Sequence, residues 1–141
     1  MTTIVYRAGV LASDTRMSSG DWIGTGRAVK VRRLDDGTLI GFTGNYAVAS
    51  VAADQVAAGG EIPKTGDGAR VIRIKPDGSI VIFEDDAKHD LSGADFYAWG
   101  SGSIPALGAL YAGASAEDAV RIAMLVDPNT GGDVVSVRHK A

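Results

Sequence analysis

Two short turns, each flanked by strand-like segments, constrain the fold of this chain more than any other feature. The first turn is Asp35-Asp36-Gly37 and the second is Pro76-Asp77-Gly78. Glycine takes the positive φ of a tight turn at little cost, and the β-branched residues on either side favour paired strands. The strands of these two hairpins are predicted at residues 27–34, 38–43, 69–75 and 79–84.

The start of the chain predicts one more hairpin. Residues 2–7 and 10–14 are its strands, and Ala8-Gly9 is its turn. Two further strands are expected at residues 96–99 and 133–138. Residues 17–26, which are rich in glycine and serine, and the acidic residues 84–93 are predicted to be loops.

Three helices complete the pattern. The first is predicted over residues 46–58, with Asn45 as its N-cap and Gly59-Gly60 as its end. The second is expected over residues 104–111, before Gly113. The third begins after Ser115 and ends at Asp127-Pro128, and its predicted apolar face consists of Ala119, Ile122, Ala123 and Val126. Because runs of strands and runs of helices are segregated along the chain, the expected class is α+β, with antiparallel sheets covered by helices.

Composition narrows the range of functions. The 141 residues suit a single domain, 1–141. There is no cysteine and there are only two histidines, which excludes thiolate chemistry and argues against a metal site. The net charge is -3 and the only basic cluster is VKVRR, so nucleic-acid binding is not expected. We also expect no membrane span and no signal peptide, and therefore a cytoplasmic protein.

Thr2 is a candidate nucleophile because of its position. A cytoplasmic aminopeptidase normally removes an initiator Met that precedes a small residue, and this would leave Thr2 with a free α-amine. That amine, with a pKa near 8, can accept the proton of the Thr2 hydroxyl without a histidine. If Met1 is retained, the nitrogen is an amide and cannot act as a base. The alternative is that Thr2 simply begins a strand.

Several motifs give Thr2 a context. In chain order they are Met-Thr-Thr-Ile-Val at the start, Ala12-Ser13-Asp14, Val29-Lys30-Val31-Arg32-Arg33-Leu34, Gly41-Phe42-Thr43-Gly44, Gly100-Ser101-Gly102 and Asp127-Pro128-Asn129-Thr130-Gly131-Gly132. This series resembles the HslV (ClpQ) and proteasome β-subunit family of N-terminal threonine hydrolases. The resemblance is close from residue 2 to about 50, moderate over 99–137 and poor over 59–98.

The resemblance implies a role for each residue of a catalytic set. Thr2 matches the nucleophile and Lys30 the buried lysine that keeps the amine neutral. Asp14 matches the carboxylate paired with that lysine. The remaining matches are Gly44 to the oxyanion N–H donor, Ser101 to the serine that bonds the amine, and Asp127 and Thr130 to the outer polar pair. Read without the family, Lys30 could be an exposed strand lysine, Asp14 a turn residue and Thr3 an ordinary strand residue.

The family also implies a fold and an assembly. The fold would be a four-layer αββα sandwich of antiparallel sheets, the N-terminal-nucleophile hydrolase fold. No room is left after residue 58 for the family's second long helix, so one helical layer is expected to be reduced. Peptide or unfolded protein would be the substrate of a homo-oligomeric ring, without metal or organic cofactor. Loss of the second helix puts docking of the family's ATPase unfoldase in doubt.

Two other functions remain open at this stage. The chain could be a catalytically silent shell component of the same fold, which would retain Met1. It could also be an amidase that uses Thr2 on a small molecule. Phe42 lies two residues before Gly44, where it could line a specificity pocket or belong to the core.

Overall fold

The computed structural model describes residues 2–19, 22–59, 69–84, 87–91 and 93–140. Its strands are β1 (Thr3–Arg7), β2 (Val10–Asp14), β3 (Ser18–Ser19), β4 (Trp22–Ile23), β5 (Val31–Arg33), β6 (Leu39–Thr43), β7 (Arg70–Ile74), β8 (Ile80–Glu84), β9 (Ala87–Asp90), β10 (Phe96–Gly100) and β11 (Val134–Arg138). Its helices are α1 (Tyr46–Ala57), α2 (Ser103–Tyr111) and α3 (Ala116–Val126).

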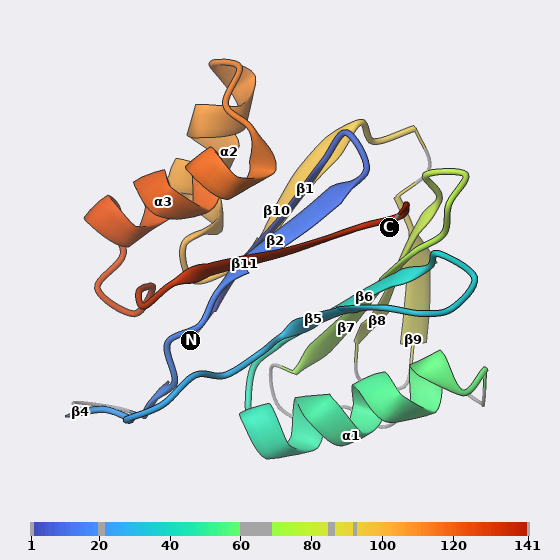
Figure 1. The fold of residues 1–141 in the computed structure, drawn as a ribbon, viewed down its shortest axis with the longest axis horizontal. Coiled ribbons are helices and arrows are strands. Elements are labelled where there is room, and N and C mark those ends of the chain that lie inside the picture. Colours follow the sequence, from blue (N-terminus) through green and yellow to red (C-terminus); the bar gives the residue numbers. More distant parts are fainter. Residues whose placement is uncertain (1, 20–21, 60–68, 85–86, 92, 141) are drawn as a thin grey trace.

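These elements stack in four layers (Figure 1). Helices α2 and α3 cover one sheet, in which the strand order is β10-β1-β2-β11. The second sheet has the order β5-β6-β7-β8-β9, and α1 packs on its outer face. Every strand pair is antiparallel. The predicted α+β sandwich is therefore confirmed, and within the described residues one helical layer contains two helices and the other contains α1 alone.

Three apolar clusters hold the layers together. One lies between α2, α3 and the first sheet, and it is built largely from alanines, which let helices and strands approach closely. Another fills the space between the two sheets with large side chains such as Ile4, Leu39 and Trp99. The last joins the second sheet to the buried face of α1. Because successive side chains of a strand point to opposite faces of its sheet, one strand contributes residues to two of these clusters.

The helix caps form where the sequence predicts them. The Asn45 side chain accepts a hydrogen bond from the backbone N–H of Val48, 3.2 Å away, and Ser115 accepts one from Asp118 at 3.1 Å. Of the predicted apolar face of α3, Ala119 and Ala123 are confirmed as buried, but Ile122 and Val126 are not. The buried positions are Ala116, Ala119, Val120 and Ala123, whereas Ile122 and Val126 are exposed.

Three predicted segments also differ from the structure. Strand β5 covers only Val31–Arg33 of the expected residues 27–34, because the backbone N–H of Ala28 bonds to the carbonyl of Thr15, outside that sheet. The predicted loops at 17–26 and 84–93 contain the short pair β3–β4 and the edge strand β9. The expectations for Met1, for the end of the first helix at Gly60 and for residues 61–68 lie outside the described residues.

Candidate active site

Thr2 lies at the end of the first sheet, just before β1 and beside the loop that follows β10. It is buried, and its carbonyl oxygen accepts a hydrogen bond from the backbone N–H of Ser101 at 2.8 Å. The neighbouring Gly100 has φ +99°, and a Cβ at that position would collide with the Thr2 carbonyl. The first glycine of the Gly100-Ser101-Gly102 motif therefore allows the loop to approach the start of the chain.

Asp14 and Lys30 form a buried ion pair on one side of Thr2. Lys30 Nζ donates to Asp14 Oδ1 at 3.0 Å and to the carbonyl oxygen of Arg16 at 2.8 Å. Burial lowers the pKa of Lys30 below its ordinary value, and the charge and hydrogen bond of Asp14 oppose that shift. The pair itself is not exposed, with 0% and 4% of Asp14 and Lys30 accessible. The exposed-lysine interpretation of Lys30 is therefore wrong.

A second polar group forms around Asp127, at the end of α3. Its Oδ2 accepts hydrogen bonds from Ser101 Oγ and Thr130 Oγ1, both at 2.6 Å, and its Oδ1 accepts one from the N–H of Asn129 at 3.1 Å. Burial raises the pKa of Asp127, but the three hydrogen bonds together lower it by more than burial raises it. The pKa of Asp127 therefore lies below its ordinary value. The carboxylate therefore holds Ser101 beside Thr2.

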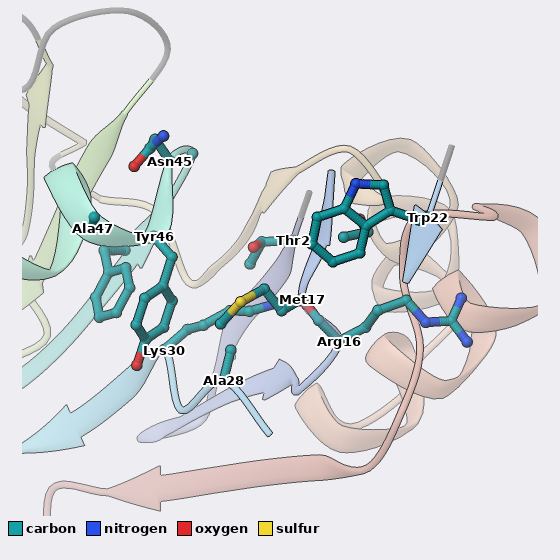
Figure 2. A pocket seen from close by; sticks show the side chains of 12 residues that line it. Thr2, Arg16, Met17, Trp22, Ala28, Lys30, Asn45, Tyr46 and Ala47 are labelled. Carbon is teal, nitrogen blue, oxygen red and sulfur yellow. Dashed lines mark hydrogen bonds between the residues drawn. The ribbon is translucent and has the colours of Figure 1, made fainter. Parts of the chain in front are cut away.

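Thr2 and Gly44 together line two hollows. The first, of about 220 Å³, is also lined by Lys30, Met17, Phe42 and Tyr46. Figure 2 shows Lys30 and Tyr46 on one side of this hollow, with Thr2 and Trp22 on the other. The second hollow, of about 400 Å³, extends along Trp99, Ser101 and Ile104.

The lining of these hollows bears on two of the predicted residues. Phe42 is buried and lines the first hollow, so it contributes to both the core and the pocket. Gly44 has φ +101° and follows the last residue of β6, and because it lines both hollows with Thr2, the turn before α1 lies next to Thr2.

The predicted site residues thus converge on the start of β1. Thr2 is adjacent to Ser101, and Asp14 bonds to both Lys30 and the backbone N–H of Gly131, at 3.1 Å for the latter. Gly44 lines the same hollows as Thr2.

In the described residues, no three His, Asp or Glu side chains are grouped to hold a metal ion, and no helix is long and apolar enough to cross a membrane.

Comparison with known proteins identifies the fold. No family model and no curated protein matches this sequence. Among solved structures, Thiobacillus denitrificans BPH in complex with epoxomicin aligns with a TM-score of 0.69 at 23% identity over 96% of both chains. HslV from Trypanosoma brucei aligns with a TM-score of 0.71 at 19% identity, over 96% of this chain and 97% of that one. The chain has the HslV fold.

A second BPH structure gives the same result, with a TM-score of 0.67 at 23% identity over 96% of this chain and 95% of that one. The likeness to HslV that the sequence motifs predict is therefore confirmed. The alignments cover 96% of the chain, so the likeness is not limited to the segments in which the sequence motifs lie.

Two residues of this candidate site were not singled out from the sequence. Arg16 accepts the Lys30 hydrogen bond with its carbonyl, and its guanidinium donates to the carbonyl of Pro128 at 3.0 Å. Thr3, interpreted as an ordinary strand residue, bonds to Asp14 through its backbone and to Thr130 through its hydroxyl. The partners lie 11 to 127 positions away in the chain, so no local sequence signal could reveal these contacts.

Proposed function

We propose that this chain is a threonine-type endopeptidase subunit of a self-compartmentalised, HslV-like ring, with Thr2 as its nucleophile after removal of Met1. The observation that supports the proposal most strongly is the convergence of two separate polar groups on Thr2. Asp14 and Lys30 form one of these groups, and Ser101 and Asp127 belong to the other. A strand-starting threonine without a catalytic role would need neither.

The proposed reaction has two steps. The Thr2 α-amine accepts the proton of the Thr2 hydroxyl while Oγ attacks the peptide carbonyl, and the backbone N–H of Gly44 stabilises the resulting oxyanion. A donor of this kind lowers the barrier by about 3 kcal/mol. The amine then donates the proton to the leaving nitrogen, which leaves an ester on Thr2. In the second step the amine activates water, which hydrolyses the ester and releases the acid.

Lys30 is proposed to set the protonation state of the amine. A nearby cation disfavours a second positive charge, so a protonated Lys30 keeps the α-amine of Thr2 neutral and basic. Asp14, at 3.0 Å, stabilises the charge on Lys30. Ser101 and Asp127 hold the amine on its other side. No metal or organic cofactor enters this scheme.

Assembly into a ring is supported by apolar side chains on the outer helices. Ile104, Tyr111 and Leu125 are large hydrophobic residues that are largely exposed. Exposed apolar groups on neighbouring elements are typical of surfaces that bind another protein. The proposal takes residues 1–141 as one cytoplasmic domain acting on peptides or unfolded proteins. The proposal does not include docking of an ATPase unfoldase, because α1 is the single described helix on its face of the sandwich.

Thr2→Ala tests the proposal directly. We expect the purified wild-type chain to have lost the mass of one methionine residue and to be labelled stoichiometrically by epoxomicin, with which the similar BPH was solved. Thr2→Ala should fold, lack labelling and lose peptidase activity. The matched control is Thr38→Ala, which truncates another buried threonine, at the opposite end of β6 from Gly44. Retained Met1 with no labelling would indicate the silent shell component instead.

A further inference from the structure

Thr3 faces away from the substrate side of the site. Side chains alternate along β1, so that Ile4 joins the cluster between the sheets and Val5 the cluster under the helices. Thr3 therefore shares the helix side with Val5, and it is completely buried. Among the described residues, those that line the two hollows include Thr2 but not Thr3. Any role of Thr3 in the reaction must act through other residues.

The hydroxyl of Thr3 donates into the Asp127 group. Thr3 Oγ1 and Thr130 Oγ1 are 2.7 Å apart, and either could be the donor on distance alone. However, Thr130 has one hydroxyl proton, and it lies on the 2.6 Å bond to the Asp127 carboxylate, which can only accept. The proton between the two threonines must therefore come from Thr3. The bonds run in one direction, from Thr3 to Thr130 to Asp127, which also accepts from Ser101.

The backbone of Thr3 donates to the other polar group. Its N–H lies 3.2 Å from Asp14 Oδ1, the oxygen that also accepts from Lys30 Nζ at 3.0 Å. Thr3 is thus bonded directly to one carboxylate of the site and through Thr130 to the other. Since Thr3 is covalently bound to Thr2, these bonds fix the start of the chain relative to both groups.

Gly102 supplies the space that Thr3 needs. A Cβ on residue 102 would collide with Thr3 Oγ1 and would lie 3.0 Å from Thr130 Oγ1. Gly102 does not have a positive φ, so its backbone does not require glycine there. The second glycine of Gly100-Ser101-Gly102 therefore makes room for the Thr3–Thr130 hydrogen bond and for the Ala123 side chain of α3.

We propose that Thr3 is a positioning residue, whose hydroxyl and N–H hold the Thr2 amine and hydroxyl in register with Ser101 and Lys30. This role rests on the proposed function of Thr2. It predicts a loss in the rate of the chemical step without a loss in ligand affinity, because Thr3 does not line the hollows that would bind the ligand.

The test measures the rate of epoxomicin labelling by intact mass at several epoxomicin concentrations, which separates the maximal rate kinact from the apparent affinity KI. Thr3→Val keeps the shape of Thr3 and removes its hydroxyl. We expect kinact to fall about tenfold, which corresponds to the loss of about one buried hydrogen bond, while KI changes less than about twofold. Thr3→Ser should recover most of kinact. Thr38→Val, which changes a buried threonine outside the site in the same way, should match the wild type.

A second pair of variants covers the case in which Thr3→Val does not fold. Thr3→Ala and Thr3→Ser differ in the hydroxyl alone, so kinact should be about tenfold higher for Thr3→Ser. Equal kinact in the two variants, or a change confined to KI, would overturn the positioning role while the labelled wild type still supports the proposed function. An unlabelled wild type would overturn the proposed function, and this role with it.

Discussion

Asp14 and Asp127 are both carboxylates of the candidate site, yet the structure holds them in different ways. Asp14 is inaccessible and accepts from the cation of Lys30. Asp127, which is 9% accessible, accepts from the neutral hydroxyls of Ser101 and Thr130. A buried carboxylate that loses its paired cation keeps an uncompensated charge, whereas a carboxylate bound by several neutral hydroxyls loses them one at a time. We therefore expect removal of one partner of Asp14 to cost much of the stability at once, and removal of one partner of Asp127 to cost a smaller part of it.

Lys30→Met should have the largest effect on stability. It leaves the Asp14 carboxylate buried without its cation, which costs about 3–5 kcal/mol of unfolding free energy when one partner of a buried pair is removed. Urea unfolding followed by circular dichroism measures this change. Epoxomicin labelling should also be lost, because the cation that keeps the Thr2 amine neutral is absent.

The double variant Asp14→Asn with Lys30→Met separates the two consequences. Neutralising the carboxylate removes the uncompensated charge, so part of the lost stability should return. Labelling should not return with it. If the unfolding free energy of Lys30→Met alone lay within about 1 kcal/mol of the wild-type value, the protein would not depend more on the Asp14 ion pair than on the Asp127 hydrogen bonds.

Asp127→Asn should have an intermediate effect that depends on pH. Hydrogen bonds to a charged group contribute about 1.5–3 kcal/mol, so we expect a loss of about 2 kcal/mol at pH 7. The pKa of Asp127 is lowered in the folded state, so its contribution is complete above the unfolded carboxyl pKa of about 4 and is lost as the pH falls toward the folded value. The stability gap between wild type and variant should therefore narrow below about pH 4. Urea unfolding at pH 7 and pH 3 measures it, and a constant gap would contradict the assignment.

The sequence predicts the parts of this molecule that depend on neighbouring residues. The turns at Asp35-Asp36-Gly37 and Pro76-Asp77-Gly78 and the caps at Asn45 and Ser115 are local, and the structure contains all four. Strand β9 was missed because its residues, Ala87–Asp90, are all exposed and show no apolar alternation. It exists because it pairs with β8.

In the candidate site, too, some features could be predicted from the sequence and others depend on contacts between distant residues. The family motifs predicted which residues could surround Thr2, and the structure brings them together. The contacts of Thr3 could not be predicted, because they depend on the exact approach of Gly102 and Thr130 from the far end of the chain. The buried face of α3 was predicted only in part, with Ala119 and Ala123 correct. The sequence contains two overlapping apolar stripes there, and packing against the sheet selects the one with smaller residues.

Arg32→Ala should have the smallest effect, although its ion pair is the shorter one. Arg32 Nη1 lies 2.7 Å from Asp54 Oδ1, compared with 3.0 Å for Lys30 and Asp14. The Arg32 and Asp54 side chains are 37% and 67% accessible, however. Water therefore solvates both charges when the pair is broken, and the pair adds little to the unfolding free energy. We expect a change in unfolding free energy of about 0.5 kcal/mol or less and an unchanged labelling rate. Lys30 and Arg32 are two positions apart in the chain, so the two variants test burial against distance. If Arg32→Ala costs as much as Lys30→Met, pairing rather than burial determines how this protein depends on its charges.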